Sequence, residues 1–164
     1  MTGETAISWP DEHTPEASVF WAVNELQIPA EPDVVWAWLT RPELWPRYYS
    51  NARLIRHLDG PWPAVELGSR WRWLSFGALV TSEITEYARG ERLAWSAKTL
   101  AGSGHHGWVL RRESDGTFVR TEETQKGLGM RLIGSALKPM MVRMHQRWLE
   151  GLSEVAAGGS PPPP

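Results

Sequence analysis

Residues 128–156, LGMRLIGSALKPMMVRMHQRWLEGLSEVA, form the longest periodic stretch of this sequence. Its apolar residues recur at helical spacing, at Ile133, Leu137, Met141, Met144, Trp148 and Leu152. This spacing predicts one long amphipathic helix, whose apolar face must pack against other elements of the fold.

The residues before this helix alternate between apolar and polar side chains, as β-strands do. Six such runs with turn signals between them fill residues 52–125, namely ARLIRHL, SRWRWLSF, ALVTSEITEY, RLAWSAKTL, HHGWVLRRE and FVRTEETQ. An earlier strand-like run at 17–28 is followed by two short helical segments at 28–40 and 41–51. This order predicts an α+β fold, in which an antiparallel sheet curls and the long helix fills its open face.

Length and composition limit the domain organisation and the partners. The chain has 164 residues, and we expect one domain over 16–157, a flexible leader at 1–15 and a disordered tail at 158–164. Its 17 basic and 19 acidic residues are well mixed, which argues against nucleic acid as a partner. There is no apolar run of membrane-spanning length and no cysteine, so we expect a cytoplasmic protein with neither membrane contact nor disulfides.

Tryptophan is the unusual residue type, with 11 copies against three Phe and three Tyr. Its large apolar area and single N–H donor suit both packed cores and the walls of ligand pockets. Composition alone leaves both uses open.

Several segments of the chain resemble one known group of proteins. They are IPAEPDVVWAWLTRPELWPRYY, GSRWRWLSFG, ITEYARGERLAW, HHGW, DGTFVRTEETQKG and WLEGL, which together span most of residues 18–154. On these segments the chain is similar to the SRPBCC superfamily, also called START-like, and within it to the bacterial polyketide cyclase/dehydrase group. The resemblance implies a helix-grip fold, in which a curved seven-stranded antiparallel sheet surrounds the C-terminal helix and encloses a deep cavity. It does not imply one reaction, because the superfamily contains enzymes, carriers and receptors.

The stretch GSGHHGWVL places two histidines side by side in one predicted strand. Alternate residues of a strand face opposite sides of its sheet, so His105 and His106 cannot both face a cavity. The remaining histidines (His13, His57 and His145) share no spacing with them, so no third ligand is evident and we expect neither a metal nor another cofactor.

The sequence SDGT at 114–117 predicts a tight hairpin turn, which sets the register of the two strands beside it. With Asp115 and Gly116 as the turn, Trp108 lies opposite Glu123 and His106 lies opposite Gln125. The apolar side with Trp108 is then the inner one, so His106, Glu123 and Gln125 project inward. His105 and the residues Val109, Arg111, Arg120 and Glu122 face outward, where we expect solvent.

Glu123 and His106 are the candidate catalytic residues, because a carboxylate beside an imidazole can move protons. The inward polar groups could equally hydrogen-bond one another. Burial would raise the pKa of Glu123, whereas a protonated His106 within reach would lower it. The candidate ligand-binding residues are Trp73, Trp95, Trp108, Gln125, Tyr48, Tyr49, Met141 and Met144.

Two functions fit these residues. The first is a polyketide cyclase-, aromatase- or dehydratase-like enzyme of bacterial secondary metabolism, with an acyl carrier protein among its partners. The second is a non-catalytic binding or carrier protein for a hydrophobic or aromatic small molecule. The resemblance implies the internal cavity common to both functions, and the sequence does not choose between them.

Overall fold

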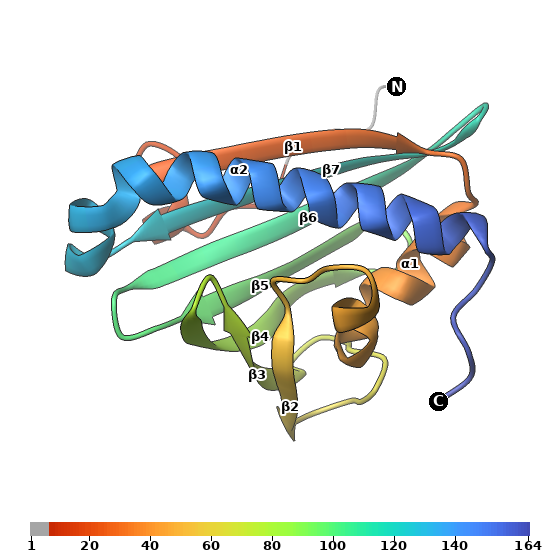
Figure 1. The fold of residues 1–164 in the computed structure, drawn as a ribbon, viewed down its shortest axis with the longest axis horizontal. Coiled ribbons are helices and arrows are strands. Elements are labelled where there is room, and N and C mark those ends of the chain that lie inside the picture. Colours follow the sequence, from red (N-terminus) through yellow and green to blue (C-terminus); the bar gives the residue numbers. More distant parts are fainter. Residues whose placement is uncertain (1–6) are drawn as a thin grey trace.

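The computed structural model describes residues 7–164 and contains a curved antiparallel sheet with one long helix across its concave face (Figure 1). The strands are β1 (Phe20–Ile28), β2 (Arg53–Asp59), β3 (Arg70–Ser75), β4 (Ala78–Ala88), β5 (Arg92–Lys98), β6 (Ser103–Glu113) and β7 (Gly116–Lys126). The helices are η1 (Asp11–His13), α1 (Pro32–Leu39), η2 (Pro42–Arg47) and α2 (Leu128–Ala157), of which η1 and η2 are 3-10 helices. No helix among the described residues is both long and apolar enough to cross a membrane.

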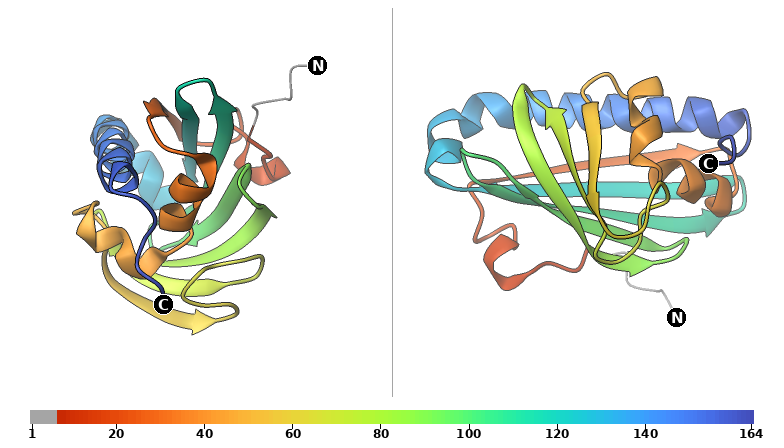
Figure 2. Two further views of the ribbon diagram at one scale, coloured as in Figure 1. Left: turned by 90° about the vertical axis from the view of Figure 1, so that its right-hand side faces the viewer. Right: turned by 90° about the horizontal axis from the view of Figure 1, so that it is seen from below.

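The strand order is β1-β7-β6-β5-β4-β3-β2, and every neighbouring pair is antiparallel. The chain crosses from β1 to β2 through α1 and η2, so β1 lies at one edge of the sheet and β2 at the other. Seen end-on, the sheet bends around α2, and α1 and η2 close one end of the half-cylinder (Figure 2). The predicted α+β helix-grip fold with seven strands is therefore confirmed.

Two predicted boundaries differ in detail. The first strand begins at Phe20 rather than at residue 17, because residues 14–17 form a turn in which Ala17 N donates to Thr14 O. The second short helix ends at Arg47 and has 3-10 geometry, since Pro46 lies inside it and has no N–H for an α-helical hydrogen bond.

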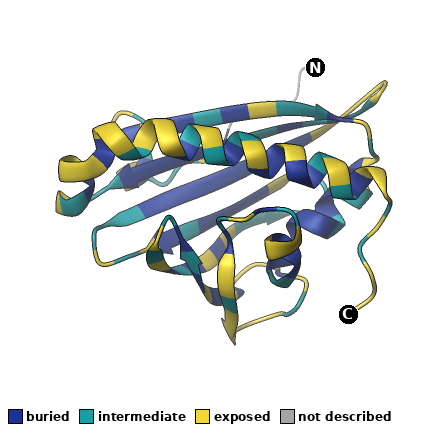
Figure 3. Cartoon of the chain, in the orientation of Figure 1, coloured by how far each residue is buried: buried dark blue, intermediate teal, exposed yellow. Residues whose placement is uncertain are grey.

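A cluster of buried tryptophans from separate elements fills the space between the sheet and the C-terminal half of α2. The indole ring of Trp45 on η2 lies 5.8 Å from Trp71, 5.4 Å from Trp95 and 4.9 Å from Trp148 on α2, centroid to centroid. Tyr49 stacks on Trp148 at 4.2 Å with an interplanar angle of 9°. These rings are almost wholly inaccessible to solvent (Figure 3), so much of the tryptophan excess serves the packed core.

The outer face of the sheet is partly covered by the residues that precede β1. Ile7 lies over Gly107, where an added Cβ would come within 2.6 Å of the Ile7 side chain. Thr124 Oγ1 donates to His13 O at 3.0 Å, and the Trp9 ring lies 5.5 Å from the His105 ring. Residues 7–15, predicted as part of a flexible leader, therefore contact the domain closely.

These contacts correct the expected surface of β6 and β7. His105 faces outward as predicted, but it is buried beneath the segment that contains Trp9. Val109 and Glu122, expected in solvent, are buried as well, and Glu122 Oε2 accepts a 2.7 Å hydrogen bond from Trp21 Nε1. At the other terminus, Gly159 O accepts from Trp38 Nε1 at 2.8 Å, so the predicted tail also begins with a specific contact.

Candidate functional site

A cavity of about 120 Å³ lies between the sheet and the N-terminal half of α2, beside the tryptophan cluster. Most of its wall is apolar, and the polar side chains gather in two places. The lining residues are Tyr49, Trp73, Ser75, Phe76, Ala78, Val80, Trp95, Ala97, Thr99, Ala101, His106, Glu123, Gln125, Met130, Ile133, Leu137, Met141, His145 and Trp148. Ile133, which is 47% exposed, and the partly exposed Phe76 and Ala101 place the cavity entrance near the start of α2.

The register of the β6–β7 hairpin determines which side chains form the first polar group. Glu113 pairs with Gly116, so the turn consists of Ser114 and Asp115 rather than the predicted Asp115 and Gly116. His106 consequently lies opposite Glu123, and Trp108 opposite Thr121. The predicted pairing was wrong by two residues, but an even shift keeps every side chain on its face, so His106, Glu123 and Gln125 do point inward.

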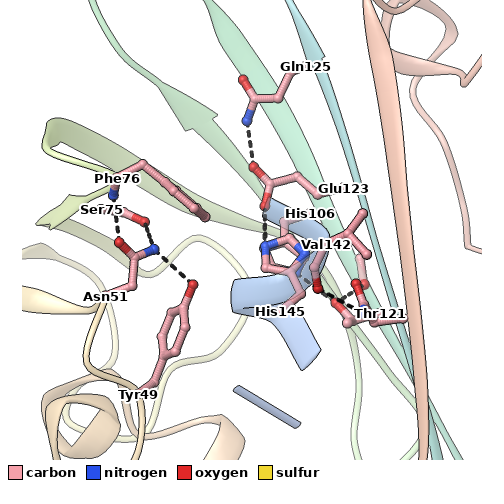
Figure 4. A network of polar contacts seen from close by, with 12 residues as sticks. Tyr49, Asn51, Ser75, Phe76, His106, Thr121, Glu123, Gln125, Val142 and His145 are labelled. Carbon is pink, nitrogen blue, oxygen red and sulfur yellow. Dashed lines mark hydrogen bonds and ion pairs between the residues drawn. The ribbon is translucent and has the colours of Figure 1, made fainter. Parts of the chain in front are cut away.

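Glu123 forms the centre of a buried polar group that we call the His106–Glu123–His145 cluster (Figure 4). Its Oε2 lies 3.0 Å from His106 Nδ1 and 3.1 Å from His145 Nε2. Its Oε1 accepts a hydrogen bond from Gln125 Nε2. The two imidazole rings lie 4.7 Å apart, centroid to centroid, and both are at most 2% exposed.

His145 was missed because sequence reasoning compared histidines by their spacing along the chain. The structure brings His145 from α2 to two strands of the sheet, so the premise that no third ligand exists was wrong. A usable signal was present: His145 follows Met141 by four residues and precedes Trp148 by three. It therefore lies on the apolar stripe of the helix, where a polar side chain needs a partner.

The charges in the cluster follow from its surroundings. Burial disfavours the carboxylate form of Glu123, but contacts with His106 and His145 outweigh burial and lower the pKa of Glu123 below its usual value. Burial is also the largest influence on His106 and lowers the pKa of its imidazole, against the attraction of Glu123. Sequence analysis left the direction of the Glu123 pKa shift open between burial and His106. Burial does raise this pKa, but the histidine contacts at 3.0 and 3.1 Å outweigh it.

The second polar group lies across the cavity, on the segment between η2 and β2, at the end of β3 and in the turn that follows β3 (Figure 4). Asn51 Nδ2 donates to Tyr49 Oη at 2.8 Å and to Ser75 Oγ at 3.0 Å, while Phe76 N donates to Asn51 Oδ1 at 2.8 Å. Burial raises the pKa of Tyr49, so its hydroxyl stays protonated. No hydrogen bond among the described residues uses that hydroxyl proton, which leaves it available to a ligand.

The structure gathers most, but not all, of the predicted binding residues at this cavity. Trp73, Trp95, Gln125, Tyr49 and Met141 line it together with Glu123 and His106. Trp108, Tyr48 and Met144 are not part of its lining in the described structure. Trp108 packs behind His106 and against Trp148, Tyr48 Oη donates to Trp38 O at 3.1 Å, and Met144 packs against the tryptophan cluster.

Solved structures with the same fold come from several bacteria. A hypothetical protein of Helicobacter pylori matches with a TM-score of 0.86 and 25% identity, over 95% of this chain and 99% of its own. A Thermus thermophilus protein matches with a TM-score of 0.70 and 20% identity, over 86% of this chain and 99% of its own. A protein from the dynemicin biosynthetic locus matches with a TM-score of 0.64 and 17% identity, over 86% of this chain and 48% of its own.

No curated protein shows significant similarity to the chain. A family model described as polyketide cyclase / dehydrase and lipid transport matches residues 22–157, from β1 to the end of α2. The matched range reaches every strand and contains every residue of the His106–Glu123–His145 cluster. The chain therefore belongs to the polyketide cyclase/dehydrase and lipid transport family of the SRPBCC superfamily, which implies that it binds a hydrophobic ligand.

Proposed function

We propose that this protein binds a compact, mainly apolar molecule that carries one oxygen-containing group. The observation that carries the proposal is a largely apolar cavity of about 120 Å³ with the His106–Glu123–His145 cluster in its wall. Cavities of about 150 Å³ hold one benzene ring, so a single-ring compound is the expected size. This volume favours a single-ring compound over a long polyketide chain.

Two facing polar groups would orient such a ligand. Tyr49 has a hydroxyl proton to donate on one wall, and Glu123 offers an acceptor on the other. Trp73 and Trp95 supply flat apolar surface between them. A phenol or an aromatic ketone has the matching combination of one ring and one polar oxygen.

Ligand binding can be tested by tryptophan fluorescence. Titration with single-ring phenols and aromatic ketones should change the emission of the wild-type protein, because Trp73, Trp95 and Trp148 line the cavity. Ala97→Leu extends a side chain into the cavity and should weaken binding at least about tenfold. Ala88→Leu, at the far end of β4 and outside the cavity lining, is the matched control and should bind as wild type. Equal binding by both variants would contradict the proposal.

A cyclase- or dehydratase-type enzyme is a second candidate, favoured by the 3.0 Å contact between His106 and Glu123 inside the cavity. Such a pair can give and take a proton as a bound ligand rearranges. Glu123→Gln keeps the shape of the side chain but cannot exchange that proton. Turnover of a ligand identified by the titration should fall about a hundredfold or more in this variant while binding persists. Unchanged turnover would restrict Glu123 to orienting the ligand.

A further inference from the structure

We propose that His106, Glu123 and His145 bind one divalent transition-metal cation in the wall of the cavity. Each side chain offers one ligand atom, and the three ligand atoms lie within 4.8 Å of one another. The residues come from β6, β7 and α2, so only the folded chain brings them together. The inference depends on these three side chains alone and not on the identity of the organic ligand.

Two of the three contact distances match ligands at right angles around one ion. Glu123 Oε2 lies 3.0 Å from His106 Nδ1 and 3.1 Å from His145 Nε2. Two ligand atoms bonded at about 2.1 Å and separated by a right angle lie about 3.0 Å apart. The three ligand atoms lie within 4.8 Å of one another, so binding would draw the two imidazoles toward the ion. Two histidines and one carboxylate are a typical Fe²⁺ ligand set that leaves positions open.

Thr121 holds the His106 ring with Nδ1 toward Glu123. Its Oγ1 lies 2.7 Å from His106 Nε2 and 3.2 Å from Gly107 O, and His106 Nδ1 lies 3.0 Å from Glu123 Oε2. A hydrogen bond at the outer nitrogen of an imidazole orients the ring so that the other nitrogen can bind a metal. A bound cation would take the place of the proton between Nδ1 and Oε2.

Gln125 fixes the carboxylate in the same way. Its Nε2 donates to Glu123 Oε1, which leaves Oε2 directed at both histidines. Outer hydrogen bonds of this kind orient metal ligands and commonly accompany them. The cluster therefore has ligand atoms and the supporting contacts that a metal site requires.

The cluster contains no permanently charged side chain besides Glu123. Among the described residues, no lysine or arginine side chain forms an ion pair with Glu123, which is 7% exposed, so only the two imidazoles in contact with it can offset its charge. When both imidazoles are neutral, a divalent cation bound between them would supply the compensating charge. The open coordination positions would face the cavity, where the oxygen of a bound ligand could occupy one.

Isothermal titration calorimetry with Co²⁺ tests the inference in the absence of any organic ligand. Chelator-treated wild-type protein should bind one Co²⁺ per chain and should not bind Mg²⁺, which prefers oxygen ligands. Glu123→Gln and His145→Leu should each weaken Co²⁺ binding at least about a hundredfold. Thr121→Val should weaken it about tenfold, because it removes the hydrogen bond that orients the His106 ring.

His105→Phe is the matched control, since His105 neighbours His106 but faces the other side of the sheet. This variant should bind Co²⁺ as the wild type does. Anomalous diffraction from wild-type crystals soaked in Co²⁺ should place the ion within about 2.3 Å of the three ligand atoms, which tests the site even if a variant fails to fold. No Co²⁺ binding by the wild type, equal binding by Glu123→Gln, or density elsewhere would overturn the inference. Because no organic ligand is present, each of these results leaves the proposed function separately testable.

Discussion

His105 and His106 are adjacent in β6 but have opposite surroundings. His106 Nδ1 lies 3.0 Å from Glu123 Oε2 in the cavity wall, whereas the His105 ring packs 5.5 Å from the Trp9 ring on the outer face. Burial lowers the pKa of His105 to about 4, so this imidazole is neutral at physiological pH. The pair is therefore one candidate functional residue beside one structural residue, as strand alternation requires.

The titration of His13 should lower the free energy of unfolding of the protein at acidic pH. Burial first, and then the charge of Lys126, lower the pKa of His13 below its usual 6.5, although Glu12 opposes this. As the pH falls, the unfolded chain binds a proton at His13 before the folded chain does. The contribution of neutral His13 is therefore complete above about pH 6.5 and is lost below it, by at most about 1.4 kcal/mol per pH unit.

Urea unfolding of wild type and His13→Phe between pH 5 and 8 measures this effect. The difference between their free energies of unfolding should be constant from pH 7 to 8 and should shift against the wild type below pH 6.5. The difference in the free energy of unfolding at pH 8 is the control. It measures what the substitution costs in packing and in the 3.3 Å contact of His13 Nε2 with Ser103 Oγ, apart from any titration. A difference that stays constant throughout would show that His13 titrates alike in both states.

Trp45 should be the most costly single tryptophan to remove. It is fully buried, and four other indole rings lie within 5.8 Å of its own, centroid to centroid. Trp45→Ala should lower the free energy of unfolding by about 3–5 kcal/mol, since the cavity it leaves cannot collapse. Trp62→Ala, at a partly exposed ring that stacks on His57, should cost about 1–2 kcal/mol. Equal losses in denaturant unfolding would contradict the central position of Trp45.

The fold should require a glycine at position 151, where α2 approaches the end of η2. An added Cβ at this position would lie 2.1 Å from the carbonyl oxygen of Tyr48, which belongs to the backbone and cannot rotate away. Gly151→Ala should therefore cost about 1–3 kcal/mol of stability. Gly158→Ala, whose Cβ would meet no atom closer than 3.4 Å, should change stability by less than about 0.5 kcal/mol. Thermal unfolding of the two variants would detect the difference, and similar melting temperatures would refute it.

The element order and the inward faces could be predicted because both follow from local patterns. The alternation around Trp108 identified the inner face of β6 and β7. The predicted strand pairing was wrong by two residues, and because a shift of two leaves each side chain on the same face, the inner face was still predicted correctly. Contacts between distant segments could not be predicted in this way. The position of His145 beside Glu123 depends on how α2 crosses the sheet, and the burial of His105 depends on where the segment with Trp9 lies.

We expect a small molecule to occupy the cavity beside the His106–Glu123–His145 cluster. The most direct test is two-dimensional ¹H–¹⁵N NMR of the indole N–H groups during titration with a single-ring phenol. The signals of Trp73, Trp95 and Trp148, which line the cavity, should shift, while those of Trp9, Trp21 and Trp62 outside it should stay fixed. Saturable shifts confined to the first three would support the claim. Shifts confined to Trp9, Trp21 or Trp62, or no shift with any phenol or aromatic ketone of that size, would contradict it.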